Sequence, residues 1–244
     1  MKKTETTSRG NALSMAEAYF AFLGTPSKRD SGDLEQIAST KFIDMLGEVH
    51  AAHRPRYDLS ACMAGTASNF NGRVWFWSDI HFFHNSIIRY CQRPFADVAR
   101  MNDALLKNCL ACVRANDILV FGGDITFGTA EATNQLLRAI PAYKILVLGN
   151  HDVDGRTKTS LFKLAMDEVG ACMELEYKGT PLFLSHYPVH DKLLAPGQIN
   201  IHGHLHNTPF PKELGTGARH INISVECTGY EPVSIDWLLE NAAK

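Results

Sequence analysis

Short groups of His, Asp and Asn are the residues of this sequence best suited to chemistry. Of its 11 histidines, 8 lie between His81 and His206, and most of these stand next to Asp, Asn or Gly. Neutral imidazole is the commonest protein ligand for transition metals, so this clustering favours a metal centre over isolated core histidines. The candidate ligands fall in separate segments and are Asp79 with His81, Asp124, Asn150, His186, and His204 with His206.

The types of these ligands narrow the choice of metal. Carboxylate, carboxamide oxygen and imidazole without thiolate favour Mn, Fe, Co, Ni or Zn over Cu or an iron–sulfur cluster. The set is too rich in nitrogen for Mg or Ca alone. It also exceeds what one tetrahedral zinc requires. Two ions that share a carboxylate would use the whole set, and Asp124 is the predicted bridge.

Each candidate segment follows a predicted β-strand. The strands are short apolar runs at Val74–Trp77, Ile118–Phe121, Lys144–Leu148, Pro181–Ser185 and Ile199–His202. The carboxyl ends of such strands open on one edge of a sheet, where open α/β folds place their sites. In the two pairs spaced i, i+2, extended backbone would direct both side chains to the same face.

Helical and strand patterns alternate between these segments. Helices are predicted at Asp97–Ala115, Thr129–Ala139, Thr159–Val169 and Ser234–Ala243, with further strands at Met173–Tyr177 and Ile221–Glu226. Helix-connected strands indicate parallel pairing, whereas the closely spaced later strands indicate antiparallel or mixed pairing. We therefore expect an α/β fold whose second half is mixed.

The chain divides near residue 72 into a helical N-terminal extension, residues 1–72, and a main domain, residues 73–244. Helices are predicted at Asn11–Leu23 and from about Leu34 to Val49, followed by a linker. We expect the extension to pack on the main domain or to mediate self-association into a homo-oligomer. A substrate lid or a partner-binding element is the alternative.

Composition excludes several classes of protein. The 244 residues are 45% apolar and 20% charged, which is ordinary for a globular domain, and the net charge of −2 argues against a protein that coats long nucleic acid. No apolar run approaches the roughly 20 residues of a membrane span, and the start does not read as a secretory signal. Six scattered cysteines fit reduced thiols. The expected location is the cytoplasm.

Asp79-x-His81, Gly123-Asp124, Gly149-Asn150-His151-Asp152, His186 and Gly203-His204-x-His206 resemble, in order and spacing, the motifs of the calcineurin-like metallophosphoesterase superfamily. The resemblance covers roughly residues 73–235. Residues 78–95 are similar to those of a compact bacterial and phage branch. The fold implied is a sandwich of two stacked mixed β-sheets flanked by helices.

The resemblance also implies roles. One metal would be held by Asp79, His81 and His206, the other by Asn150, His186 and His204, and Asp124 would bridge them. The implied activity is dimetal-dependent phosphoester hydrolysis, in which a metal-bridging hydroxide attacks phosphorus. In this scheme His151 protonates the leaving group, and Asp152 hydrogen-bonds the His151 imidazole and keeps its acid form available.

The sequence offers two candidate substrate contacts and several possible substrate classes. His84 and Arg93 are candidate substrate contacts, with packing and solvent exposure as their respective alternatives. An open site favours a phosphodiester of nucleotide type, with Mn²⁺ as the first choice of metal. A phosphomonoesterase, including a protein phosphatase, is the alternative within the enzyme class. A module that binds a partner through its N-terminal helices is the alternative from another class.

Overall fold

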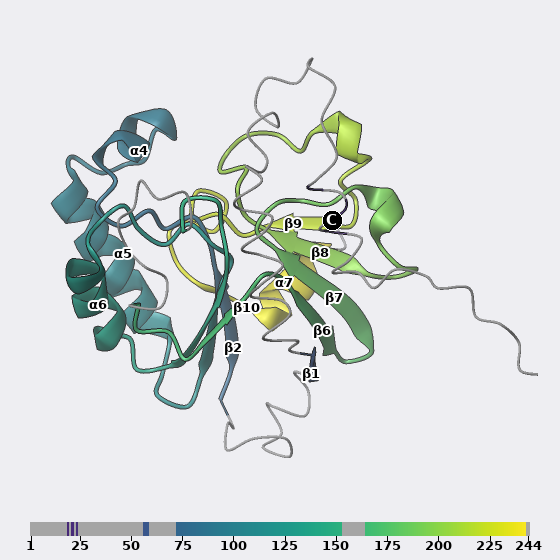
Figure 1. The fold of residues 1–244 in the computed structure, drawn as a ribbon, viewed down its shortest axis with the longest axis horizontal. Coiled ribbons are helices and arrows are strands. Elements are labelled where there is room, and N and C mark those ends of the chain that lie inside the picture. The colour runs from purple at the N-terminus through teal and green to yellow at the C-terminus, as the bar shows by residue number, and fades with distance from the viewer. Residues whose placement is uncertain are drawn as a thin grey trace, which may run out of the picture.

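The computed structural model describes residues 56–58, 72–152 and 164–242, together with Tyr19, Ala21 and Leu23. Two mixed five-stranded sheets face each other, and helices flank them (Figure 1). The expected fold class is thereby confirmed. Among the described residues, no helix is long and apolar enough to cross a lipid bilayer.

The first sheet has the strand order β10-β2-β3-β4-β5. Its strands are β2 (Val74–Trp77), β3 (Ile118–Phe121), β4 (Tyr143–Val147), β5 (Glu168–Gly170) and β10 (Val233–Ser234). β2 to β5 pair in parallel, and β10 is antiparallel to β2. Parallel pairing aligns the carboxyl ends of β2, β3 and β4 at one edge, and the residues that follow these strands meet there.

The second sheet has the order β1-β6-β7-β8-β9. Its strands are β1 (Arg56–Asp58), β6 (Met173–Tyr177), β7 (Thr180–Ser185), β8 (Ile199–His202) and β9 (His220–Asn222). β6 and β7 form an antiparallel hairpin, while β7, β8 and β9 run parallel. The carboxyl ends of these three parallel strands therefore also share an edge.

Among the described residues between 72 and 242, the α-helices are α4 (Asn85–Tyr90), α5 (Val98–Cys112), α6 (Ala130–Ala139) and α7 (Ile235–Ala242). α5 and α6 lie against the outer face of the first sheet (Figure 1). Each begins at a side-chain cap, since Asp97 accepts from the Arg100 N–H at 2.8 Å and Thr129 accepts from the Ala132 N–H at 3.2 Å.

Alternate residues of the buried strands enter two different hydrophobic cores. In β2, Val74 and Phe76 point between the sheets, where they join Leu182 and other residues of the second sheet. Trp75 and Trp77 lie on the opposite face and pack with residues of α5 and α6. This division follows from the two-residue period of a strand. It explains why β2 and β3 are apolar throughout, because both of their faces are covered.

Two sequence-based expectations differ from the structure. Glu168–Gly170 is a strand, where a helix at Thr159–Val169 was expected, because these residues extend the first sheet beside β4. The start of that expected helix lies outside the described residues. The strand expected at Ile221–Glu226 ends at Asn222, after which the chain turns into the site.

Part of the predicted N-terminal extension belongs to the folded body. Arg56–Asp58 pairs in parallel with β6 and so adds a strand to the second sheet. Tyr19 and Leu23 are helical and buried, and the Tyr19 ring meets Phe183 edge-on at 5.8 Å between centroids. Most of the two predicted N-terminal helices and their linker lies outside the described residues. The boundary at residue 72 stays a prediction.

Candidate metal centre

Loops from both sheets meet at the carboxyl ends of their strands. Ser78, directly after β2, forms an isolated parallel bridge with Ser224, which follows β9. The Val225 N–H donates to the Ser78 carbonyl at 3.1 Å, and the Ile223 N–H donates to the His202 carbonyl at 2.8 Å. The two contacts of Ser78 join the sheets at the edge where the candidate ligands emerge, and the Ile223 bond holds β9 beside β8 within the second sheet.

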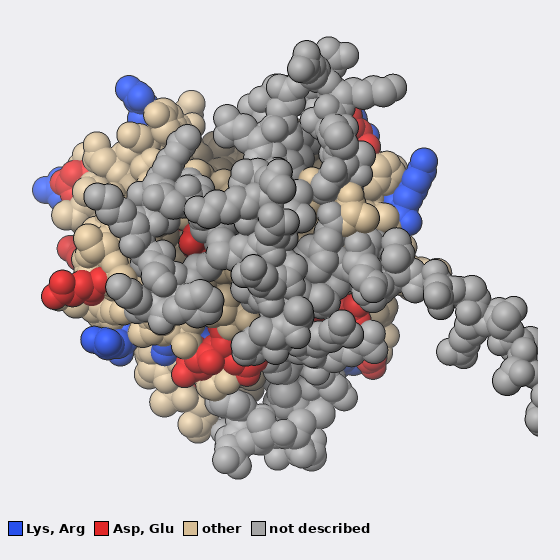
Figure 2. Space-filling model, in the orientation of Figure 1, with Lys and Arg blue, Asp and Glu red and all other residues tan. Residues whose placement is uncertain are grey.

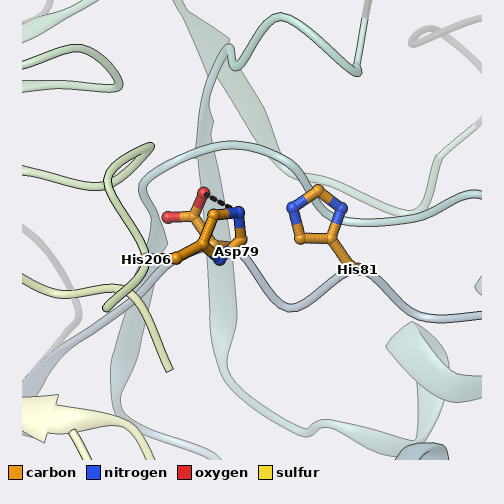
Figure 3. A group of neighbouring side chains, drawn as sticks. All are labelled: Asp79, His81 and His206. Carbon is orange, nitrogen blue, oxygen red and sulfur yellow. Dashed lines mark ion pairs between the residues drawn. The ribbon is translucent and has the colours of Figure 1, made fainter. Parts of the chain in front are cut away.

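Asp79, His81 and His206 form one potential metal-binding group. One ligand atom from each lies within 4.8 Å of the others. Figure 3 shows the His206 ring beside the Asp79 carboxylate, with the His81 ring to the side of this pair. The distance from His206 Nε2 to Asp79 Oδ1 is 3.8 Å. Asp79 and His81 come from the loop after β2 and His206 from the loop after β8, so both sheets contribute.

Asp79, Asp124 and His186 form a second potential group, again within 4.8 Å. His186 Nε2 lies 3.5 Å from Asp124 Oδ2 and 3.1 Å from Asn150 Oδ1. The same Asp124 oxygen lies 3.6 Å from His81 Nε2. Asp124 therefore stands between a histidine of each group, as a shared carboxylate would.

His204 joins both groups through its backbone and its ring. Its N–H lies 3.1 and 3.0 Å from the two carboxylate oxygens of Asp79. Its ring centroid is 5.3 Å from that of His186 and 4.3 Å from that of Tyr187. All seven ligands expected from the sequence are thus brought into one connected cluster.

The His81 ring provides the test of whether a metal fits here. The residue is 1% exposed, and both of its ring nitrogens are buried without a hydrogen-bond partner among the described residues. An unsatisfied buried polar atom costs about 1–3 kcal/mol, and coordination would remove this cost. Burial also lowers the pKa of His81 well below its usual value, which keeps the ring in the neutral form that binds metal. The residues present fit a metal centre.

Negative charge accumulates around His186 and His206. Burial by itself would lower the pKa of His186, but the Asp124 carboxylate outweighs it and raises that pKa to about 9. Burial opposes protonation of His206 too, yet hydrogen bonds with Cys91 and Glu226 and the charge of Asp79 raise its pKa to about 11. The cluster therefore holds protons near neutral pH in the absence of a cation, as expected of negative charge gathered for a metal.

Five of the candidate ligands have left-handed backbone conformations. The φ values are 55° for Asp79, 52° for His81, 56° for Asp124, 68° for His204 and 49° for His206. The i, i+2 pairs are therefore not in extended backbone, and the expectation that extension aligns them was wrong. Left-handed non-glycine residues are strained by about 1–3 kcal/mol each and collect at functional sites. Here the turns direct each side chain into the cluster.

Glycines allow the loops to approach one another closely. A Cβ on Gly149 would lie 2.2 Å from Asp124 Oδ1, and one on Gly203 would lie 2.2 Å from Asp79 Oδ2. Real Cβ atoms do not come so close, and both neighbouring carboxylates are buried. Only glycine fits at these two positions without displacing a candidate ligand.

Arg93, expected as a substrate contact or a solvated side chain, is neither. It is 3% exposed and donates through Nη1 to the Ile80 carbonyl at 2.8 Å and through Nη2 to the Asp79 carbonyl at 2.7 Å. Its Nε and Nη2 each lie 2.8 Å from Glu226 Oε1. Arg93 therefore supports the loop that presents Asp79 and His81, and it is too buried to reach a substrate.

Glu226 contacts a candidate ligand, and sequence reasoning missed it. Its carboxylate oxygens lie 3.1 and 3.2 Å from His206 Nδ1. A carboxylate on Nδ1 holds the proton on that nitrogen and leaves Nε2 as the ligand atom. No local motif identifies Glu226, because its partners Arg93 and His206 lie far away in sequence.

Asp152 has a different contact from the one expected. Its oxygens accept backbone N–H bonds from Asp124 at 2.8 Å, Ile125 at 3.0 Å and Gly149 at 2.8 Å. These bonds tie the loop after β4 to the loop after β3, and they replace the expected bond to the His151 imidazole. Burial and the charge of Asp124 raise the pKa of Asp152 to about 6.

His151 and His84 border the cluster. His151 Nε2 lies 4.0 Å from Asp124 Oδ2, and its side chain is 28% exposed. The His151 N–H donates to Asp124 Oδ1 at 2.9 Å, which places the residue at the edge of the centre. The His84 ring centroid is 5.4 Å from that of His81.

Comparisons with known proteins agree with this geometry. A model of the family described as calcineurin-like phosphoesterase matches residues 72–217. The uncharacterised protein MJ1445 of Methanocaldococcus jannaschii is 33% identical over 175 residues, covering 69% of this chain and 90% of that protein. The crystal structure of AQ665, a protein of unknown function from Aquifex aeolicus, is 27% identical with a TM-score of 0.55, covering 69% of this chain and 98% of the other. The chain belongs to the calcineurin-like phosphoesterase family of metal-dependent phosphoester hydrolases.

Proposed function

We propose that this protein is a dimetal-dependent phosphodiesterase acting on a small substrate of nucleotide type. The observation that carries the proposal is the position of the Asp124 carboxylate. One of its oxygens lies 3.6 Å from His81 Nε2, 3.5 Å from His186 Nε2 and 4.0 Å from His151 Nε2. A carboxylate oxygen within 4.0 Å of a histidine from each ligand group and of a third, more exposed histidine suits a bridging position in a centre with a proton donor at its edge.

In this proposal Asp79, His81 and His206 hold one ion, Asn150, His186 and His204 hold the other, and Asp124 belongs to both. When bound, the two ions would supply Lewis-acid stabilisation of phosphoryl charge and an activated water at neutral pH. The mixed oxygen and nitrogen ligands favour Mn²⁺, with Fe, Zn, Co and Ni as alternatives.

His151 is the proposed general acid. Its backbone N–H is anchored on Asp124 Oδ1, and its side chain is the partly exposed imidazole beside the shared carboxylate. From this position it would deliver a proton to the oxygen of the leaving alcohol as the bond to phosphorus breaks. Such help is typically worth about 10²–10⁴-fold in rate. Asp152 contributes indirectly, by fixing the loop on which His151 stands.

The charge distribution supports a small substrate. On the face drawn in Figure 2, the visible Lys and Arg side chains stand at the margins, with Asp and Glu side chains among them. Among the described residues in this view, they do not form a continuous basic track. A long nucleic acid is bound chiefly by neutralising many phosphates in a row, so the net charge of −2 favours a ligand with few phosphates.

The test of reaction class is turnover of bis(p-nitrophenyl) phosphate and p-nitrophenyl phosphate with Mn²⁺, using Asp124→Asn as background. We expect the diester to be preferred and the variant to lose activity. Preference for the monoester would replace the proposal with a phosphomonoesterase. Wild-type rates equal to the Asp124→Asn background with Mn, Fe, Co, Ni and Zn would contradict general phosphoester hydrolysis on these substrates.

The role of His151 is tested separately. His151→Ala should keep both metals and lose about 10²–10⁴-fold in turnover of a diester with an alkyl leaving group. It should lose far less with p-nitrophenolate, which leaves without a proton. Loss of metal from His151→Ala would show that His151 is a ligand instead.

A further inference from the structure

A strip of aromatic rings leads from the metal centre to the protein surface. The Phe127 ring lies 4.8 Å from that of His151 and 5.4 Å from that of His81, between centroids. The His84 ring stacks on Phe127 at 3.8 Å with an interplanar angle of 20°. Tyr90 follows, 6.3 Å from His84. We call Phe127, His84 and Tyr90 the aromatic wall.

The inner part of the aromatic wall is held firmly by the backbone. The Phe127 N–H donates to the Phe82 carbonyl at 2.8 Å, beside an isolated bridge between Phe82 and Thr126. The Thr126 hydroxyl accepts the Gly128 N–H at 2.9 Å. The loop after β3 therefore fixes the position of Phe127 before any ligand arrives.

The outer end of the aromatic wall differs from the rings of the hydrophobic cores. Tyr90 is 64% exposed, and the other large hydrophobic side chain exposed among the described residues is Leu110, on α5. The Arg89 guanidinium carbon lies 5.3 Å from the Tyr90 ring centroid. An exposed ring with a cation beside it, continuous with a catalytic centre, suits a flat ligand group that carries negative charge.

We propose that the aromatic wall binds an aromatic substituent of the phosphodiester, of which a nucleobase is the common biological kind. The inference rests on the proposed function and names the substrate group that this site selects. The phosphoryl group would lie at the metal centre, and the ring of the substituent would stack on the exposed Tyr90 ring, which stands at 76° to the ring of His84. Arg89 would face an additional anionic group on the same ligand. Stacking of a base on aromatic side chains does not depend on which base is present.

Two diesters with the same leaving group isolate this contact. They are the p-nitrophenyl ester of thymidine 5′-phosphate and methyl p-nitrophenyl phosphate. We expect wild type to prefer the nucleoside ester by at least about tenfold in kcat/KM, chiefly through KM. In Tyr90→Ala this preference should fall about fivefold to tenfold, as expected for one lost stacking contact. Tyr90→Phe should retain it, because the ring is kept.

Leu110→Ala is the matched control, since it removes the other exposed large side chain from a helix outside the aromatic wall. Its preference should equal that of wild type. A second readout does not depend on turnover. In saturation-transfer NMR, thymidine 5′-phosphate should receive magnetisation at its base protons from wild type and Tyr90→Phe, and markedly less from Tyr90→Ala.

The outcomes separate the inference from the proposed function. Equal kcat/KM for the two esters in wild type, or an unchanged preference in Tyr90→Ala, would contradict binding of the substituent by the aromatic wall. Neither result would contradict the proposed phosphodiesterase activity. If wild type hydrolyses neither ester, phosphodiester hydrolysis fails, and the NMR experiment alone decides the wall. Equal transfer to the base from wild type and Tyr90→Ala would then overturn it.

Discussion

Two partly buried histidines, each beside a carboxylate, have different surroundings in this molecule. His206 has its Nδ1 on Glu226, and its Nε2 faces Asp79 at 3.8 Å, beyond hydrogen-bond distance. In His220, Nε2 lies 3.0 Å from Asp191 Oδ1, and Nδ1 lies 3.1 Å from Asn200 Oδ1. Both nitrogens of His220 are occupied within the protein, whereas one nitrogen of His206 is left for a ligand.

The two histidine–carboxylate pairs also differ in the other contacts that each carboxylate makes. Asp191 is occupied by its own loop, because it accepts the Thr216 N–H at 2.7 Å and thereby joins η3 (Asp191–Leu193) to the segment before β9. Glu226 is held by buried Arg93, which also carries the loop of Asp79. A histidine–carboxylate pair therefore indicates a metal ligand only when the second ring nitrogen faces further ligand atoms.

The largest expected effect comes from removing each histidine. His206→Ala should lose the metal held with Asp79 and His81 and reduce turnover by about 10³-fold or more, because a ligand and its charge pairing are lost together. His220→Ala should keep metal and turnover, and lose about 1–3 kcal/mol of stability from broken buried hydrogen bonds. Metal analysis and denaturant unfolding check both. Metal loss in His220→Ala would remove the distinction between the two histidines.

Sequence reasoning identified the candidate ligands and missed the residues that support them, for a physical reason. Asp79, Asp124 and His186 follow apolar strands, so their residue types and positions together indicate a site. The partnership of Arg93 and Glu226 spans 133 residues and leaves no local pattern. It arises from tertiary packing alone.

The same limit explains the misassigned elements. β5 is a three-residue strand whose sequence, Glu-Val-Gly, has no strong preference, and it forms because β4 offers an open edge. The left-handed turns at Asp79 and His81 were equally invisible, since neither residue is a glycine. In both cases the surrounding fold imposes a conformation that the local sequence does not favour.

Gly203→Ala tests the geometry around Asp79 without removing a ligand. The added methyl group would overlap the Asp79 carboxylate, so we expect turnover to fall about 10²-fold with weakened metal binding. Gly170→Ala is the control, because its nearest neighbour would be the Cys172 carbonyl at an ordinary 3.5 Å. Turnover of Gly203→Ala within threefold of wild type would show that the site tolerates displacement of Asp79.

Glu226→Gln tests whether the carboxylate beside His206 contributes to metal binding. The amide can no longer stabilise the charge and tautomer of His206, so metal affinity should fall about 10–100-fold. Asp191→Asn makes the same chemical change beside His220 and should leave metal affinity unaltered. Competition titration with a chelating dye measures both variants. Equal affinities for the two would show that Glu226 has a purely structural role.

The smallest effect is the pH dependence of metal binding. In the metal-free protein the pKa values of His186 and His206 are raised to about 9 and 11. Raised histidine pKa values contribute stability that is present below the ordinary pKa of about 6.5 and is lost as pH rises through the raised values. Metal binding has the opposite sign, because a metal must displace these protons.

Apparent metal affinity should therefore increase by about tenfold per pH unit for each proton displaced between pH 6.5 and 9. Calorimetry in buffers of different ionisation enthalpy would count the protons released. His206→Ala removes one of these protons, so the slope should be shallower for the metal it still binds, whereas His220→Ala should keep the wild-type slope. If apparent metal affinity in wild type did not change with pH, His186 and His206 would be neutral before the metal binds. The neighbouring carboxylates would then not raise the pKa values of these two rings.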